Sequence, residues 1–178
     1  MSMFYQDLSN NDLSKSWDIY NEYRQVIGRK ERDKPLEPGE YHLRAGLFLF
    51  NQEGKILLQK RYIDNKHEND IWDVSVIGSA TAKENSLQAI KRETKEQLGI
   101  DLPIKKTNLI SRKFYTDWFC DWFYYQLNIK NENLKTNSLI KKIQFFSPEK
   151  ADSQLKRFGI GNVHNELFKA ESKVKRNS

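Results

Sequence analysis

The sequence contains a single cysteine and no long hydrophobic run. Cys120 has no partner for an intrachain disulfide, which fits a reducing compartment. No segment approaches the roughly 18–20 apolar residues that a membrane-spanning helix needs, and the first residues, MSMFYQDLSNNDLSK, lack the apolar core of a signal peptide. Cysteine and histidine residues at zinc-ligand spacing are absent, as is an aromatic RNA-binding signature. We therefore expect a cytoplasmic protein with no membrane contact.

The 178 residues carry a formal net charge of +6 at pH 7. Most of the excess is C-terminal, because from Lys141 onward lysine and arginine outnumber aspartate and glutamate by nine to four. This charge favours an anionic partner, and phosphates are the commonest small anions in a cell, although a solvated basic surface explains the same charge. We expect a small anionic substrate rather than nucleic acid, and the composition leaves a homo-oligomer open.

The chain length suits one domain with a short arm. Residues 1–16 are polar and are interpreted as an arm, and residues 17–178 as a single domain. Within that domain we expect an N-terminal hairpin at 17–30, a core at about 41–148 and C-terminal helices at 149–174. Hydrophobic residues make up only 38% of the chain, but the 12% of aromatic residues supply large surfaces for a core.

Short apolar runs separated by polar turns predict strands on both sides of one central helix. The predicted strands cover residues 17–20, 25–30, 42–50, 55–61, 72–77, 109–116, 119–129 and 143–146. The central helix is predicted to start at the N-cap residue Asn85 and to end at Gly99, and further helices are predicted at 148–157 and 162–174. Residues 62–71 are predicted to form a polar loop. This order predicts a mixed sheet flanked by helices.

The central helix is predicted to have two distinct faces. Glu93, Glu96 and Gln97 stand at i, i+3 and i+4, so their side chains reach a common point and offer oxygens to a hard cation. An apolar stripe on another face is expected to pack against a sheet. The members of this stripe are Leu87, Ile90, Thr94 and Leu98.

The stretch from residue 78 to residue 100 resembles the Nudix box, which reads Gly, five residues, Glu, seven residues, Arg-Glu, an apolar residue, any residue, Glu-Glu, any residue, Gly and an apolar residue. The positions that match in register are Gly78, Glu84, Arg92, Glu93, Glu96, Gly99 and Ile100. The flanking segments WDIYNEYRQVIGR and WDVSVIG are similar to one Nudix branch, that of isopentenyl diphosphate isomerase. The resemblance extends over residues 17–148.

This resemblance implies an α/β fold, the Nudix α/β/α sandwich, with a mixed sheet, the box helix on one face and terminal helices. It also implies hydrolysis of a diphosphate linkage in a small nucleoside-diphosphate-type compound, with Mg²⁺ or Mn²⁺ bound by carboxylates and phosphate oxygens. Glu93 and Glu96 would bind the metal, with Gln97 and the carbonyl group of Ile77 as further ligands, and Arg92 would orient the glutamates. The remaining box positions, expected to be structural, are Gly78, Glu84 and Gly99.

Several positions depart from the family pattern. Gln97 replaces the second glutamate of the Glu-Glu pair, and a neutral amide binds Mg²⁺ more weakly than a carboxylate. Lys83 and Thr94 replace a glycine and an apolar residue. Further along, where many relatives carry a Glu-Glu-Val triplet, the chain has residues 138–140, which are Ser, Leu and Ile. These departures motivate a second hypothesis, a Nudix-fold binding or regulatory protein with weakened or lost catalysis.

Isomerase activity is not expected from the same alignment. Those enzymes place a cysteine before the box glycine and a metal-binding histidine after it, and this chain has Ile77 and Ser79 there. His42 aligns with one isomerase histidine and is interpreted as structural. The polar residues that could contact phosphate or assist the site, or else lie solvated at strand ends, are Lys60, Arg61 and Asp121.

Overall fold

The structure, a computed structural model, describes residues 15–61, 71–128, 134–158 and 162–177. Its strands are β1 (Ser16–Tyr20), β2 (Val26–Glu31), β3 (Tyr41–Phe50), β4 (Ile56–Arg61), β5 (Ile71–Asp73), β6 (Val76–Ser79), β7 (Leu109–Phe114), β8 (Trp118–Gln126) and β9 (Ile140–Phe146). Its helices are α1 (Ser86–Leu98), the short 3₁₀ helix η2 (Lys106–Asn108), α2 (Pro148–Phe158) and α3 (His164–Asn177). Nearly all of the predicted arm and of the predicted loop at 62–71 lies outside the described residues.

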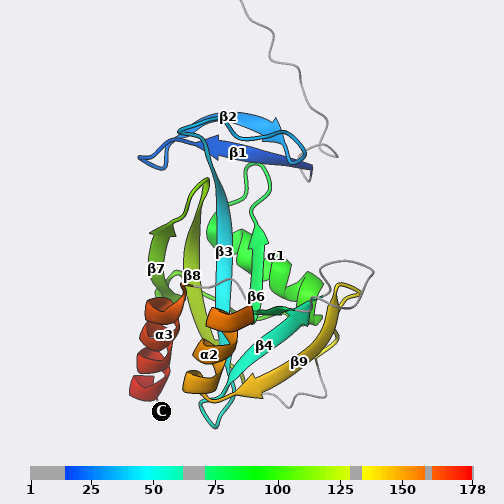
Figure 1. Ribbon diagram of the computed structural model, residues 1–178, viewed down its shortest axis with the longest axis vertical. Helices are drawn as coiled ribbons and strands as arrows, with labels where there is room; N and C mark the ends of the chain where they lie inside the picture. Colours follow the sequence, from blue (N-terminus) through cyan, green and yellow to red (C-terminus); the bar gives the residue numbers. More distant parts are fainter. Residues whose placement is uncertain (1–14, 62–70, 129–133, 159–161, 178) are drawn as a thin grey trace, which may run out of the picture.

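Strand β3 is the centre of a mixed sheet (Figure 1). It pairs with β1, β4 and β6 in the antiparallel sense and with β8 in the parallel sense. β7 extends the sheet beyond β8, while β5 and β9 pair with β4. The central position of β3 explains its composition, because a strand with neighbours on both edges and helices on both faces is buried almost throughout.

Alternate side chains of β3 point to opposite faces of the sheet, and each face has its own core. Leu43, Ala45 and Leu47 pack on the side of α1, together with Ile90 of that helix. The other core lies between the sheet and the pair α2 and α3; its members include Phe48, Phe50, Trp122, Leu155 and Leu167. The predicted α/β/α sandwich is therefore confirmed. Among the described residues, no helix is both long and apolar enough to cross a membrane.

Helix α1 has the caps that the sequence predicts. The Asn85 side chain accepts a hydrogen bond from the Gln88 backbone, and the Gln88 side chain accepts one from the Asn85 backbone, which forms a capping box. Gly99 ends the helix with a φ of 71°, a left-handed conformation that favours glycine. Ile90, Thr94 and Leu98 are buried as expected, and Leu87 packs partly buried at the edge of the same core.

The strand predicted at 72–77 is wrong, because the structure has two strands there, β5 and β6. Asp73 accepts a hydrogen bond from the backbone N–H of Val74, which ends β5. The Ser75 hydroxyl then donates to the carbonyl of Leu57 at 2.6 Å and accepts from the N–H of Leu49 at 2.8 Å. Because Ser75 bridges β3 and β4 in this way, β5 can pair with β4 while β6 pairs with β3.

Several other element boundaries differ from the prediction by one to three residues, and two of these differences have a clear cause. Trp118, predicted to lie in a turn, begins β8, because it pairs with His42 of β3. The last strand begins at Ile140 rather than Ile143, since pairing with β4 extends to Arg61. Both differences come from contacts with other strands, which local composition does not encode.

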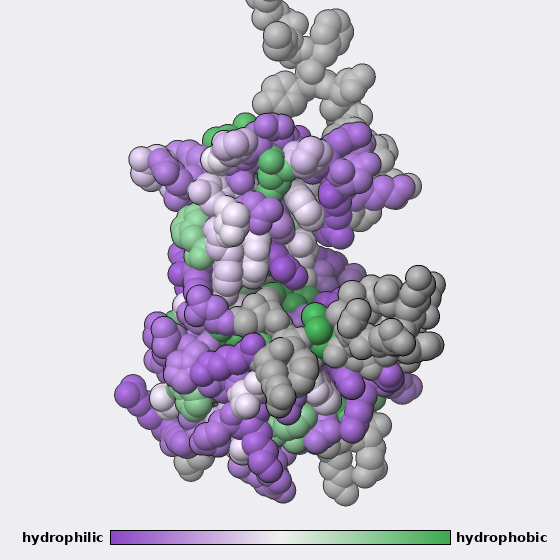
Figure 2. Space-filling model, in the orientation of Figure 1, coloured by the Kyte–Doolittle hydropathy of each residue, from purple (hydrophilic) through white to green (hydrophobic). Residues whose placement is uncertain are grey.

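The hairpin of β1 and β2 covers one end of the sheet and contacts the loop before α1 (Figure 1). Asp18 accepts a hydrogen bond from the Lys83 N–H at 2.7 Å, and the Ser16 carbonyl accepts one from the Ala82 N–H at 2.9 Å. Figure 2 shows a mostly hydrophilic face with small hydrophobic patches, one of them over this hairpin, where Val26 and Ile27 are exposed. The hairpin thus stabilises the loop that delivers the box residues.

His42 is buried against Trp17, with the two rings stacked at 4.0 Å. Burial, and then the nearby Arg44 guanidinium, lower the pKa of His42 from 6.5 to about 4. Between these two pH values the unfolded chain binds a proton at this residue and the folded chain does not. We therefore expect the free energy of unfolding to fall as the pH drops from about 6.5 to about 4, as urea titrations across that range would measure.

A His42→Phe variant should weaken this pH dependence, since phenylalanine keeps a ring against Trp17 without titrating. A Tyr23→Phe variant, which changes an exposed ring in the N-terminal hairpin, is the matched control and should keep the wild-type slope. Equal slopes in the wild type and the His42→Phe variant would contradict the assignment.

Candidate functional site

Strand β6 brings Gly78 against the acidic face of α1. A Cβ atom at residue 78 would lie 2.0 Å from Cδ of Glu93, so the Glu93 carboxylate occupies the space that any side chain there would fill. Gly78 itself pairs with Ala45 of the central strand β3. The box glycine therefore allows a carboxylate of α1 to lie directly on the backbone of β6.

Arg92 is the centre of the candidate site, because its guanidinium contacts three carboxylates. Its Nε and Nη2 atoms donate to the two oxygens of Glu84, both at 2.9 Å, in a bidentate pair. Its Nη1 atom donates to Glu93 at 2.9 Å and to Glu96 at 3.2 Å. Nη2 also donates to the carbonyl of Ser79 at 3.0 Å. Arg92 thus fixes both the acidic face of α1 and the end of β6.

Two residues of this cluster, Glu84 and Arg92, are held in their ionised forms. Burial alone would raise the pKa of Glu84, but hydrogen bonds from Arg92 and from the Thr81 N–H outweigh it, so the pKa lies below its usual value. The hydrogen bond to Glu84 is also the main reason why the pKa of Arg92 is raised, although burial opposes it. Glu84 therefore acts as a permanent anion that positions Arg92, and Arg92 positions Glu93 and Glu96.

Gln97 is buried rather than exposed beside the glutamates, with only 5% of its surface accessible. Its amide nitrogen donates to the carbonyl of Ile77 at 2.9 Å and to Oε2 of Glu93 at 2.7 Å. Its amide oxygen accepts from Nε2 of Gln59 at 3.0 Å. The structure therefore brings Glu93, Gln97 and the Ile77 carbonyl together, and the amide nitrogen lies at the point where the two acceptors meet.

The donor set at this point suits a hard divalent cation. Arg92 holds the carboxylates of Glu93 and Glu96 together, and the Gln97 amide nitrogen joins Glu93 to the Ile77 carbonyl. Carboxylate, carbonyl and amide oxygens are the ligands that Mg²⁺ and Mn²⁺ take. The space above Gly78 lets the Glu93 carboxylate reach this point. In the described part of the chain no three His, Cys, Asp or Glu side chains form such a group by themselves. The fit thus depends on Gln97 turning its oxygen inward and on phosphate oxygens completing the shell.

Lys135 and Asn137, which follow β8 in the sequence, lie at the C-terminal end of α1. The Lys135 N–H donates to the carbonyl of Leu98 at 2.9 Å, and the Asn137 N–H donates to that of Gln97 at 3.4 Å. Residues 138–140, which take the place of an acidic triplet, follow directly and add no carboxylate here. Among the residues of this segment that the structure describes, no carboxylate offsets the weaker charge of the box helix.

Asp121 has a different environment from the solvated strand end that the sequence suggested. It is 2% exposed and accepts hydrogen bonds from Arg24 and from the Ser86 hydroxyl, each at 2.6 Å. Arg24 belongs to the turn of the N-terminal hairpin, and Ser86 opens α1. Asp121 thus links the hairpin, the sheet and the start of α1. Its signal in the sequence is an aspartate inside an aromatic strand, which is typical of a buried and paired charge.

Lys60 and Arg61 end β4, immediately after Gln59, which contacts the site. Arg61 lies 3.7 Å from a carboxylate oxygen of Asp73, and the Lys60 ammonium lies 5.9 Å from the centroid of the Trp72 ring. A contact of either residue with phosphate stays a prediction. Gln59 itself was missed, although a lone glutamine within the apolar run ILLQ is a signal for a buried polar contact.

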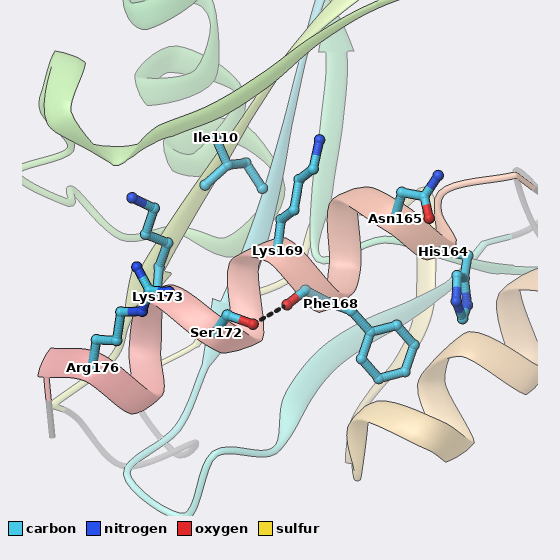
Figure 3. A pocket seen from close by; sticks show the side chains of 8 residues that line it. All are labelled: Ile110, His164, Asn165, Phe168, Lys169, Ser172, Lys173 and Arg176. Carbon is cyan, nitrogen blue, oxygen red and sulfur yellow. Dashed lines mark hydrogen bonds between the residues drawn. The ribbon is translucent and has the colours of Figure 1, made fainter.

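A cavity of about 540 Å³ lies elsewhere, along α3 (Figure 3). It is lined by Ile110, His164, Asn165, Phe168, Lys169, Ser172, Lys173 and Arg176. The lining contains three cations and no carboxylate, and α3 packs on the sheet face opposite α1. It therefore lacks the carboxylates that would bind a divalent cation, and the candidate site remains the Arg92 cluster.

The fold is an α/β/α sandwich, and Arg92 on its box helix bridges a group of glutamates. These two features are typical of Nudix proteins. The family profile described as NUDIX domain matches residues 40–167. An uncharacterized Nudix hydrolase of Listeria monocytogenes is 34% identical over 121 residues, covering 67% of this chain and 72% of the relative. The chain therefore belongs to the Nudix family.

More distant similarities agree with this assignment. An isopentenyl-diphosphate Delta-isomerase of Serratia proteamaculans is 26% identical over 83 residues, which covers 47% of this chain and 46% of the relative. The crystal structure of DR0079 from Deinococcus radiodurans has the same fold, with a TM-score of 0.69 at 18% identity, covering 87% of this chain and 98% of that one. A NUDIX hydrolase from Nitrosomonas europaea superposes with a TM-score of 0.59 at 16% identity, over 76% of this chain and 90% of that one.

Proposed function

We propose that this chain is a divalent-metal-dependent hydrolase that cleaves the diphosphate linkage of a small nucleoside-diphosphate-type compound. The observation that carries the proposal is the Arg92 guanidinium, which holds Glu84, Glu93 and Glu96 in one group at the end of β6. Membership of the Nudix family and a relative named as a Nudix hydrolase support the reaction class. A net charge of +6 suits an anionic substrate.

Each residue of the site has a distinct role in this proposal. Glu93 and Glu96 would hold Mg²⁺ or Mn²⁺, with the Ile77 carbonyl and the Gln97 amide oxygen as weaker ligands. Such an ion neutralises pyrophosphate charge and lowers the pKa of bound water. Arg92 keeps both carboxylates in place, and a carboxylate of this group would accept a proton from the attacking water. Attack breaks one P–O bond of the anhydride and releases the other phosphoryl group with that oxygen.

A Nudix-fold binding or regulatory protein is the second candidate. The observation that favours it is the Gln97 amide nitrogen, which lies within 2.9 Å of both the Ile77 carbonyl and Glu93. A protein of this kind would bind the same phosphate compounds without turnover. Isomerase activity remains excluded from the proposal, since Ile77 and Ser79 replace the required cysteine and histidine.

The test is incubation of the purified protein with Mg²⁺ or Mn²⁺ and a panel of nucleoside diphosphate derivatives, with release of phosphate or nucleotide as the measurement. We expect turnover of at least one compound and its loss in a Glu93→Gln, Glu96→Gln double variant. A Glu53→Gln variant, which alters an exposed glutamate in the turn between β3 and β4, is the matched control and should keep full activity. Absence of turnover throughout the panel, or equal turnover in the double variant, would leave the binding protein as the better candidate.

A further inference from the structure

The Gln97 amide lies between two acceptors on one side and one donor on the other. Its nitrogen donates to the carbonyl of Ile77 and to the anionic Oε2 of Glu93, while its oxygen accepts from Gln59. An N–H₂ group held between a carbonyl and a carboxylate takes the place of a small cation there. We call the point between the Ile77 carbonyl, Glu93 and Gln97 the cation pocket. In this structure the positively polarised N–H₂ group of Gln97 fills it.

Gln59 explains how that arrangement could change. Its side chain is fully buried and donates through Nε2 to Gln97, but its Oε1 atom is buried and has no hydrogen-bond partner among the described residues. A buried acceptor without a donor costs free energy, so native structures seldom keep one without a reason. Within the described part of the chain, Oε1 of Gln59 is thus a free hydrogen-bond acceptor next to the Gln97 amide.

A concerted turn of the two amides uses this acceptor. If each amide group rotates by half a turn, Oε1 of Gln97 faces the Ile77 carbonyl and Glu93, and Nε2 of Gln97 can donate to Oε1 of Gln59. Three oxygens then converge on one point, which is repulsive when the pocket is empty and favourable when a hard cation lies between them. The orientation of the amide pair and the binding of a cation are therefore linked.

We propose that Gln59 and Gln97 form an amide pair that closes the pocket without a cation and turns to open it when a divalent cation of the Mg²⁺ class binds, with Gln59 as the positioning residue. The inference rests on the proposed function for the identity of the pocket. Glutamine at residue 97 then has a role of its own, because a carboxylate could neither donate to Ile77 and Glu93 nor release that contact.

The direct test follows the side-chain amide resonances of the full chain by ¹H–¹⁵N NMR during a titration with Mg²⁺ alone. We expect the NH₂ signals of Gln97 and Gln59 to shift together and to saturate at one Mg²⁺ concentration. We also expect the contact between the Gln97 NH₂ and Gln59 to appear only in the Mg²⁺-bound form. The NH₂ signal of Gln88, which belongs to the capping box, is the internal control and should not move. Saturable shifts elsewhere in the site with unchanged Gln59 and Gln97 signals, or no saturable shift at all, would overturn the proposal.

Two variants separate a positioning role from a structural one. Gln59→Met keeps the volume of the side chain but removes the acceptor, so the dissociation constant for Mg²⁺ should rise by about 10–100-fold, as for other groups that orient metal ligands. Gln97→Glu should lower the melting temperature without Mg²⁺ and increase its rise with Mg²⁺. Gln144→Met, at an exposed position of β9, should match the wild type in both measurements. A Gln59→Met variant that binds Mg²⁺ as tightly as the wild type would contradict the positioning role.

The NMR and Mg²⁺-binding experiments use no substrate, so they test the amide pair independently of the proposed hydrolysis. If the amides turn but the panel shows no turnover, the cation pocket stands and the hydrolase proposal falls. If turnover occurs while the amide signals stay fixed during the Mg²⁺ titration, the hydrolase stands and the amide pair is only structural.

Discussion

A Gly78→Ala variant is expected to lose turnover while remaining folded. The added Cβ atom would lie 2.0 Å from Cδ and 2.3 Å from Oε1 of Glu93, so the carboxylate must leave its position above β6. The end of a glutamate side chain can move at little cost, and hence the fold should survive. Displacing Glu93 removes a charge from the proposed site, and we expect kcat to fall by about 10²–10³-fold, the usual loss for one electrostatic group.

The matched control for this change is Gly28→Ala in β2, where an added Cβ atom meets nothing within 4 Å. Circular dichroism should give the spectrum of a folded protein for both variants, while only Gly78→Ala should lose activity and Mg²⁺ affinity. Full activity in Gly78→Ala would mean that the position of the Glu93 carboxylate does not matter for the reaction.

The largest expected loss of stability comes from Gly46→Ala, the same substitution one strand away. A Cβ atom on Gly46 would lie 2.3 Å from Cζ3 and 2.4 Å from Cε3 of Trp122. Trp122 is fully buried and stacks on Phe48 with centroids 5.1 Å apart, so the ring cannot move aside as a carboxylate can. Overpacking of this kind costs about 1–3 kcal/mol, which urea unfolding followed by circular dichroism would measure.

A double variant tests whether the Trp122 ring is the cause. Trp122→Phe removes the outer ring atoms that the new methyl group would meet, so Gly46→Ala should cost less in that background than in the wild type. Strict additivity of the two free-energy losses would point to a different origin, such as strain in the backbone of β3.

The box helix could be predicted from the sequence because its signals are local. The caps at Asn85 and Gly99 and the spacing of Glu93 from Glu96 lie within about four turns of one helix, and the neighbouring hairpins are also sequence neighbours. The family resemblance added the sandwich and the residues of the site. Within this range, the element types agreed with the structure.

The features that could not be predicted depend on partners far along the chain. Gln97 is buried because Gln59, 38 residues earlier, donates to it, and Asp121 is buried because Arg24, 97 residues earlier, pairs with it. The break between β5 and β6 needs Ser75 to bridge Leu49 and Leu57 of two other strands. Such contacts leave no period in the sequence, because each is a single pair of side chains brought together only by the completed sheet.

The parallel pairing of β3 with β8 has a consequence for folding during synthesis on the ribosome. β3 ends at Phe50, but β8 begins only at Trp118, so one edge of the most apolar strand must wait for most of the chain to be synthesised. Contacts between segments so distant in the sequence slow folding, and an unpaired apolar edge can bind a neighbouring nascent chain instead. Truncated chains that stop before β8 should therefore depend on chaperones, whereas those that include it can close the sheet by themselves.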